Sequence, residues 1–179
     1  RIPEMSLLMV DGKGDPNTSV DYRDVLQSLY CVAYALKFGL KKRDSSLDFK
    51  VAPIEGLWWV EDLTEFSLAA KGNWNWTSMI MMPAQVTKEL FEAALEDAQK
   101  KKGFPSLSRV RLEAFDEGLV AQTMHIGPYA AEESTIQLLH EHIRASGHSM
   151  TGKHHEIYLS DPRRAVPEKM KTVIRQPVR

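Results

Sequence analysis

The sequence predicts an α+β fold in which one module, strand–helix–strand–strand, occurs twice. Three segments place apolar residues every three to four positions, which is the spacing of an amphipathic helix. Seven shorter segments are rich in apolar or β-branched residues and are bounded by turn-forming residues, as strands are. The order of elements over residues 5–82 recurs over residues 119–176, so we expect a duplicated unit.

The first module begins with an apolar strand that ends in a turn rich in Gly and Pro. Thr18 or Ser19 can cap the helix that follows, and Gly39 is expected to end it. Residues 64–75 are polar and less regular, and Pro83 stops the last strand. The module is predicted to hold strands over residues 5–10, 49–54 and 76–82, and a helix over residues 20–38.

A connecting helix over residues 86–102 leads to the second module. Residues 109–115 and 119–126 flank the short stretch Asp-Glu-Gly at 116–118, so we expect them to pair as a hairpin. The remaining elements are predicted as a helix over residues 132–145 and strands over residues 154–159 and 171–176.

The repeat is visible in the residues themselves. MVDG at 9–12 is echoed by MHIG at 124–127, and WTSMIMMP at 76–83 by KTVIRQP at 171–177. We therefore predict a single domain over residues 1–179, with module 1 at about 5–82 and module 2 at about 109–178. Their sheets should be antiparallel with helices on one side, which leaves an open seam between the modules as a ligand cleft.

Composition excludes several classes of protein. The 179 residues are 43% hydrophobic and 26% charged, which is ordinary for a globular domain. The formal net charge of −1 gives no electrostatic reason to expect a nucleic-acid or membrane partner. No apolar run approaches the roughly 20 residues of a membrane span. With no recognisable signal peptide and a single cysteine, Cys31, the chain is expected to be cytoplasmic.

Glu156 is the leading candidate for a functional residue. Successive side chains of a strand point to opposite faces, so His154, Glu156 and Tyr158 share one face and His155 lies on the other. A carboxylate in mid-strand between aromatic groups is costly unless it is hydrated, paired or used. The alternative is a structural ion pair with Arg163 or Arg164, and on the sequence alone the two readings are about equal.

Aromatic residues are the candidates for the walls of the cleft. Tyr129 follows a Gly-Pro turn and can offer its hydroxyl as a donor, although a packed turn tyrosine is an equal reading. Tyr158 shares a strand face with Glu156. Trp58 and Trp59 should point to opposite faces, so at most one of them lines the cleft, and Trp76 can add a further wall. Tryptophans are more often core residues than ligand platforms, but their polar tips suit a planar aromatic guest.

The sequence predicts no metal site and no cofactor. His140 and His142 are two positions apart on a helix and so do not share a face, and no cluster of Cys or Asp completes a ligand set. The glycines at 12 and 14 lack the spacing of a phosphate-binding loop. Cys31 is better explained as a buried, inert thiol than as a nucleophile.

Four motifs together resemble the GyrI-like small-molecule-binding family, in its stand-alone bacterial form. They are EGLWW at 55–59, HIGPY at 125–129, HHEIYLSDPRR at 154–164 and RQPV at 175–178, and the likeness extends over almost the whole chain. The resemblance implies two tandem strand–helix–strand–strand modules with a ligand cleft between them, and it places Glu156 in that cleft. Relatives of this type usually carry one more strand before the position of Met5, so we expect residues to precede Arg1.

The resemblance implies two functions of different classes. The first is ring-opening hydrolysis of cyclopropanoid DNA-alkylating compounds, with Glu156 orienting or deprotonating water and Tyr129 or an indole N–H stabilising the developing negative charge. The second is passive binding or sequestration of flat, lipophilic cations. Tyr158, Trp58, Trp59, Trp76 and His154 are the expected ligand-binding residues in both cases. A gyrase-directed inhibitor is a further alternative, for which the sequence shows no protein-binding surface.

Overall fold

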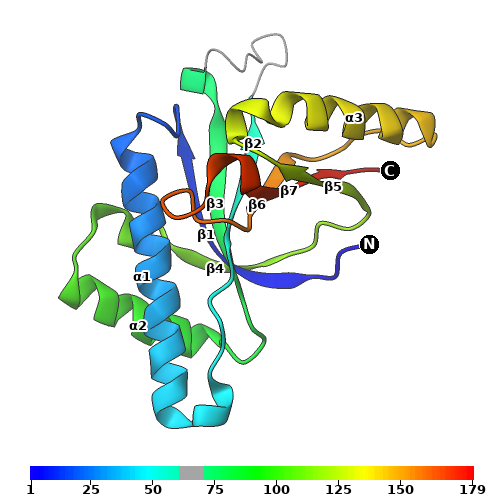
Figure 1. The fold of residues 1–179 in the computed structure, drawn as a ribbon. Helices are drawn as coiled ribbons and strands as arrows, with labels where there is room; N and C mark the ends of the chain where they lie inside the picture. The colour runs from blue at the N-terminus through cyan, green and yellow to red at the C-terminus, as the bar shows by residue number, and fades with distance from the viewer. Residues whose placement is uncertain (61–70) are drawn as a thin grey trace. The chain divides into compact units, whose positions relative to one another are not determined.

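The structure is a computed structural model that describes residues 1–60 and 71–179 (Figure 1). The described residues form two compact units. The N-terminal unit comprises Met5–Ile54 and Trp59–Phe115, apart from residues 61–70, and the C-terminal unit comprises Arg1–Glu4, Glu55–Trp58 and Asp116–Arg179. The irregular stretch expected over residues 64–75 lies mostly outside the described residues.

The N-terminal unit holds a three-stranded antiparallel sheet in the order β4-β1-β3. Helix α1 packs on β1 and β3, and α2 packs against α1 (Figure 1). The elements are β1 (Met5–Lys13), α1 (Val20–Arg43), β3 (Asn75–Met82), α2 (Lys88–Lys101) and β4 (Arg111–Phe115), with 3₁₀ turns η1 (Ser45–Leu47), η3 (Lys71–Asn73) and η4 (Pro105–Arg109).

Helix α1 begins where the sequence predicts and ends later. Ser19 is the N-cap, and its hydroxyl accepts a hydrogen bond from the backbone N–H of Tyr22. The helix runs through Gly39 to Arg43, so the predicted end at Gly39 is wrong. Leu40 is buried with the rest of the apolar stripe, and burial of a leucine stabilises by about 1.5–3 kcal/mol. That gain outweighs the roughly 1 kcal/mol cost of glycine within a helix.

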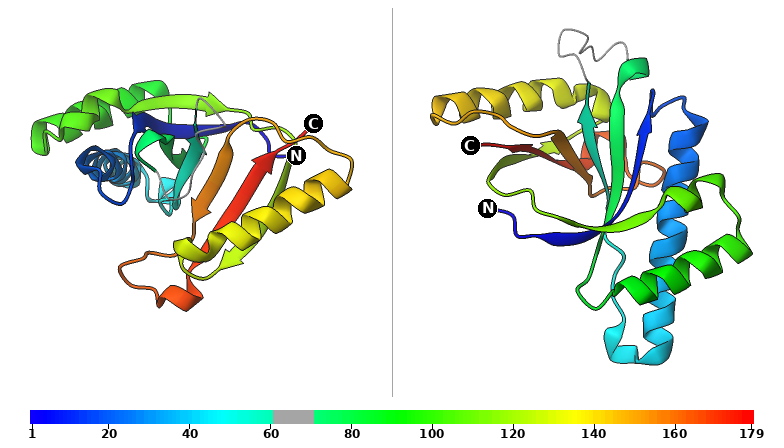
Figure 2. Two further views of the ribbon diagram at one scale, coloured as in Figure 1. Left: turned by 90° about the horizontal axis from the view of Figure 1, so that it is seen from above. Right: turned by 180° about the vertical axis from the view of Figure 1, so that it is seen from behind.

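The C-terminal unit holds a four-stranded antiparallel sheet in the order β2-β6-β7-β5. Helix α3 runs alongside β5 and β7 (Figure 2), and Leu139 and Ile143 of the helix pack on Ile174 of β7 and on Val178. The elements are β2 (Ile54–Trp59), β5 (Val120–Ile126), α3 (Glu132–Ala145), β6 (His154–Tyr158) and β7 (Lys171–Pro177), with 3₁₀ turns η5 (Tyr129–Ala131) and η6 (Pro167–Lys169).

The prediction of an α+β fold with antiparallel strands is confirmed. The order strand, helix, strand, strand is present twice among the main elements, as β1-α1-β2-β3 and as β5-α3-β6-β7. The two compact units divide the chain differently, because Glu55–Trp58 of β2 group with the second set. That the two modules superpose stays a prediction.

Two expectations about strands are wrong. The strand predicted over residues 49–54 lies at Ile54–Trp59, and the hairpin predicted between residues 109–115 and 119–126 does not form, since β4 pairs with β1 and β5 with β7. The buried side chain of Glu117 explains the second error. Glu117 bonds to His155 and Arg175. The connection between β4 and β5 therefore follows these buried contacts and does not form the tight turn of a hairpin.

Over the described residues, none of the helices has both the length and the apolar character that a membrane crossing requires.

Candidate functional site

The site is built on one face of β6, in the C-terminal unit. Cross-strand partners in an antiparallel pair point to the same face of the sheet. The register pairs Gly56 with Glu156 and Trp58 with His154, so the β2 residues join Glu156, His154 and Tyr158 on one face. His155 lies on the opposite face, as the alternation predicts.

Glu156 is held from both sides by its neighbours on this face. The Nε2 atom of His154 lies 2.9 Å from Oε1 of Glu156, and the Tyr158 hydroxyl donates to Oε2 over 2.6 Å. Only 13% of the Glu156 side chain is exposed, and 19% of that of His154. The carboxylate therefore has a fixed orientation on this face of the sheet.

Trp58 extends this arrangement across the strand pair. Its indole Nε1–H donates to the Tyr158 hydroxyl oxygen over 3.0 Å, and that hydroxyl donates onward to Glu156. The absence of a side chain at Gly56 makes the arrangement possible, because a Cβ atom there would lie 2.8 Å from Nε1 of Trp58. The glycine in mid-strand is thus explained by the close approach of an indole.

Tyr129 closes one side of the site. Its ring meets that of Tyr158 edge to face, with centroids 5.5 Å apart and an interplanar angle of 78°. Burial raises the pKa of Tyr129 to about 12, together with the negative charges of Glu132, Glu156 and Asp161. The hydroxyl therefore stays protonated at neutral pH and is available as a hydrogen-bond donor.

The turn that carries Tyr129 is fixed by His125 of β5. The ring of His125 bonds to the Thr135 hydroxyl of α3 through Nδ1, over 2.9 Å, and its Nε2–H donates to the carbonyl of Pro128 over 3.3 Å. Gly127 has a φ of 144°, and a Cβ atom there would lie 3.1 Å from Nε2 of His125. The Gly-Pro pair thus turns the chain over the histidine and delivers Tyr129 to the site.

Four buried side chains that the sequence analysis did not bring together, those of Glu55, Glu117, His155 and Arg175, form a bonded cluster around His155, on the face of β6 opposite Glu156. Nδ1 of His155 lies 2.7 Å from Oε1 of Glu117, and Nε2 of His155 lies 3.0 Å from Oε2 of Glu55. Arg175 donates to Oε2 of Glu117 over 2.7 Å. For Glu55, His155 and Arg175 a signal was present in the sequence, because these polar residues stand within strands; Glu117 lies between β4 and β5 and gave no such signal.

The predicted tryptophans are divided between the two units. Trp58 lies beside Tyr158 in the C-terminal unit, whereas Trp59 and Trp76 belong to the N-terminal unit. Trp76 is fully buried there and meets Tyr22 edge to face, with ring centroids 4.9 Å apart. That Trp59 or Trp76 contributes to ligand binding stays a prediction.

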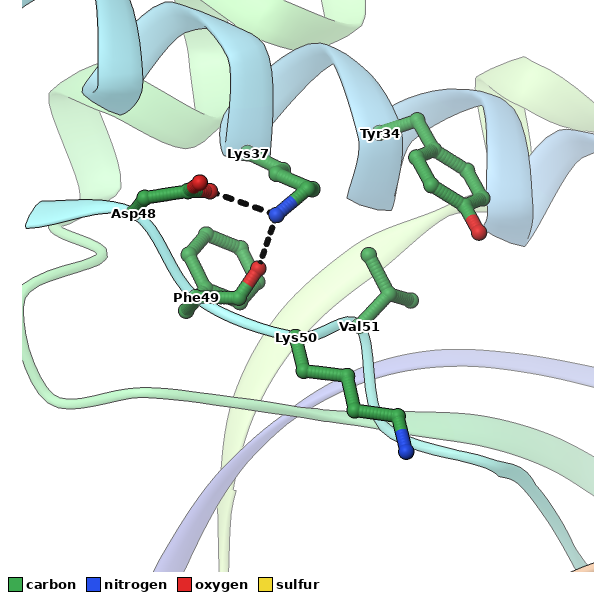
Figure 3. A pocket seen from close by; sticks show the side chains of 6 residues that line it. All are labelled: Tyr34, Lys37, Asp48, Phe49, Lys50 and Val51. Atoms are coloured by element: carbon green, nitrogen blue, oxygen red, sulfur yellow. Dashed lines mark hydrogen bonds and ion pairs between the residues drawn. The ribbon is translucent and has the colours of Figure 1, made fainter. Parts of the chain in front are cut away.

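The N-terminal unit carries a hollow of its own, of about 450 Å³, beside α1 (Figure 3). The Lys37 ammonium at its base is tied to Asp48 and to the carbonyl of Phe49, so its charge is already paired. None of the predicted site residues lines it. The lining residues are Tyr34, Lys37, Asp48, Phe49, Lys50 and Val51.

Within the parts of the chain that the structure describes, no three His, Cys, Asp or Glu side chains converge as metal ligands. His154 bonds to Glu156. His155 bonds to Glu55 and Glu117, and these residues, with Arg175, are called the His155 cluster below.

Three solved structures resemble this chain over 99% of its length and 89% of theirs. One, an uncharacterised conserved protein from Listeria innocua, is 47% identical with a TM-score of 0.91. The other two, from the same organism and each described as a hydrolase, are 44% identical, with TM-scores of 0.84 and 0.87. Among functionally curated proteins, none matches significantly.

The model of the GyrI-like small-molecule-binding domain matches residues 1–179, which is the whole chain. The resemblance that the four sequence motifs predict is thereby confirmed. The chain belongs to the family of GyrI-like small-molecule-binding domains.

Proposed function

We propose that this protein binds a flat, lipophilic electrophile against the Glu156 face of β6 and opens its cyclopropane ring by hydrolysis. The observation that carries the proposal is the oriented carboxylate of Glu156, fixed by His154 and Tyr158 and bordered by aromatic rings. The two Listeria innocua proteins described as hydrolases, at 44% identity, support a hydrolytic activity in this branch of the family.

In the proposed reaction Glu156 acts as a general base. A water oriented by the carboxylate attacks the ring carbon, and its proton passes to Glu156. The carbon–oxygen bond forms as a carbon–carbon bond of the cyclopropane breaks, and that electron pair moves to the conjugated carbonyl oxygen of the substrate. The proton then returns from Glu156 to that oxygen, so that the hydroxyl of water ends on the ring carbon and its second hydrogen on the former carbonyl oxygen.

Tyr129 is proposed to stabilise the developing oxyanion. Its raised pKa keeps the hydroxyl protonated, and a protonated phenol beside an aromatic wall can donate to a substrate oxygen as charge builds on it. Trp58 and Tyr158 are proposed to act indirectly. Tyr158 donates to the Glu156 carboxylate and Trp58 donates to Tyr158, so the two hydrogen bonds hold the carboxylate in place. A fixed donor and a fixed base that act on one substrate lower the barrier without reorganisation.

A second candidate function is binding without turnover of lipophilic cations. Tyr158 bonds to the Glu156 carboxylate, and Trp58 and Tyr129 both contact Tyr158. Aromatic faces close to a negative charge attract a flat cation. In this function Glu156 offsets the charge of the ligand and performs no proton transfer.

Product analysis separates the two functions. The full chain is incubated with a cyclopropanoid alkylator, and the ring-opened water adduct is quantified by chromatography and mass spectrometry against a no-protein blank. We expect catalytic, multiple-turnover adduct formation. A matched control is Glu168→Gln, which removes an exposed carboxylate from η6 and should retain the full rate. Saturable binding with blank-level hydrolysis would leave the second function and overturn the first.

A further inference from the structure

The His155 cluster on the reverse face of β6 has a property that the hydrolytic proposal does not use. It contains two carboxylates, Glu55 and Glu117, one guanidinium, Arg175, and one imidazole, His155. Their side chains are 7%, 1%, 10% and 0% exposed, respectively. With His155 protonated the four formal charges cancel, whereas a neutral His155 leaves one buried negative charge uncompensated, which is strongly unfavourable.

The hydrogen bonds of His155 require an extra proton. A neutral imidazole has one N–H donor and one acceptor nitrogen, but both ring nitrogens of His155 face carboxylate oxygens, at 2.7 Å and 3.0 Å. Carboxylates only accept, so both contacts are satisfied together when both nitrogens carry protons. Arg175 already donates to Glu117 and holds that group as a carboxylate.

The cluster acts on the same strand pair that builds the Glu156 site. Glu55 belongs to β2 and His155 to β6, and the register places Gly56 opposite Glu156 and Trp58 opposite His154. A bond between Glu55 and His155 therefore fixes how β2 lies against β6. That alignment sets whether the Trp58 indole reaches the Tyr158 hydroxyl, and a slip of one residue would turn Trp58 to the other face.

We propose that His155, as a buried imidazolium bonded to Glu55 and Glu117, is a positioning residue that locks β2 onto β6 and so holds Trp58 and Tyr158 in place around Glu156. The effect on catalysis rests on the function proposed above, whereas the lock itself does not. Glu55 comes from β2, Glu117 from the connection between β4 and β5, and Arg175 from β7; these are the charged groups bonded within the cluster.

The lock has a defined dependence on pH. Burial alone favours the neutral ring, but the hydrogen bonds and charges of Glu117 and Glu55 outweigh it and raise the pKa of His155. The lock therefore persists to a higher pH than an ordinary imidazole would allow, and it is released as the pH rises through the raised pKa of His155. Release separates Glu55 from His155, and the hydrogen bond from Trp58 to Tyr158 weakens with it.

Two NMR observations on the full chain test the lock without substrate. In ¹⁵N-histidine spectra, assigned with His155→Gln, we expect both ring nitrogens of His155 to remain protonated above the ordinary imidazole pKa of about 6.5. In ¹H–¹⁵N spectra, the indole signal of Trp58, assigned with Trp58→Phe, should shift at the same pH at which His155 loses its proton. A His155 ring that loses its proton at or below the ordinary imidazole pKa of about 6.5 would overturn the proposal.

The variants separate positioning from simple structural support. In His155→Gln and in Glu55→Gln the pH-dependent shift of the Trp58 indole should vanish, whereas His148→Gln should retain it. A Trp58 signal that titrates unchanged in a folded His155→Gln protein would contradict the lock. These readouts need no turnover, so a failure to hydrolyse cyclopropanoids leaves them interpretable, and a failure of the lock leaves the hydrolytic proposal standing.

Discussion

Glu156 is the residue at which the hydrolytic and the binding functions make different demands. A general base needs a fixed orientation toward the attacking water, and the bonds from His154 and Tyr158 supply a fixed orientation. A cation anchor needs only the charge. A structural carboxylate needs only its partners. One substitution that keeps the shape and removes the charge therefore discriminates between the three roles.

We expect Glu156→Gln to fold and to bind a neutral cyclopropanoid while its hydrolysis rate falls by roughly 10²–10⁴, the worth of one positioned acid–base group. If Glu156 only anchors cations, affinity for cationic ligands falls and neutral ligands bind as before. If it is only structural, the melting temperature falls and every ligand binds less well. Single-turnover rates, titrations with neutral and cationic ligands, and thermal melts measure these outcomes. Unchanged rate, affinity and stability would exclude Glu156 as the functional residue.

Gly56 is a second single position on which the site depends. A Cβ atom there would lie 2.8 Å from Nε1 of Trp58, so Gly56→Ala must displace the indole and break its bond to Tyr158. A hydrogen bond of this kind is worth about 0.5–1.5 kcal/mol net, which corresponds to a roughly two- to tenfold loss of ligand affinity. Titration of a flat aromatic ligand, followed by tryptophan fluorescence, measures it. Gly39→Ala is the matched control in α1, and equal affinity in both variants would argue against the role of Gly56.

At the scale of elements, the helices and the apolar strands could be predicted closely. Helix α3 has the predicted bounds, residues 132–145, and β3 differs from the prediction by one residue. Their apolar spacing is local information. The strand β2 was misplaced because Glu55 and Gly56 are poor strand residues, and what stabilises them there is distant in sequence. Glu55 bonds to His155, one hundred positions away, and Gly56 leaves room for the Trp58 indole, whose partner Tyr158 is one hundred positions from Trp58.

The same reasoning explains what was found and missed in the site. The alternation of side chains along β6 predicts that His154, Glu156 and Tyr158 share a face, and the structure places them within hydrogen-bonding distance. Glu117 was not predictable, because it lies outside any strand and its partners His155 and Arg175 are 38 and 58 positions away. Long-range ion pairs leave no periodic pattern in a sequence.

Helix α1 allows a stability prediction at this scale. Gly39 lies within the helix, is exposed, has no positive φ, and has no atom within 4 Å of the position of a Cβ. Gly39→Ala should therefore raise the free energy of unfolding by roughly 0.5–1 kcal/mol, since alanine loses less backbone entropy in a helix. Urea denaturation followed by circular dichroism measures the change. Gly118→Ala is the contrasting variant and should destabilise, because Gly118 has a φ of 71°.

At the scale of the whole molecule, the His155 cluster makes stability depend on pH from both sides. Burial raises the pKa of Glu117, but the bonds and positive charges of His155 and Arg175 outweigh it, so the pKa is lowered from its ordinary value of 4.5. The pKa of His155 is raised from its ordinary value of 6.5, because its bonds to Glu117 and Glu55 outweigh burial. Each shift is a difference in proton affinity between the folded and the unfolded chain.

The directions of these two pKa shifts predict that the free energy of unfolding is greatest between pH 4.5 and 6.5, the ordinary pKa values of the two groups, and falls on either side. Below 4.5, the unfolded chain binds a proton at residue 117 more readily than the folded chain does, so stability is lost as the pH falls through the lowered pKa of Glu117. Above 6.5, the folded chain retains the His155 proton that the unfolded chain has released, so stability is lost as the pH rises through the raised pKa. Thermal melts from pH 3 to 10 measure both limbs. Glu117→Gln should weaken the loss of stability at acid pH, and His155→Gln the loss at alkaline pH. Both variants should be less stable than the wild type at the optimum pH. If both variants lose stability with pH as steeply as the wild type does, other groups determine the pH dependence.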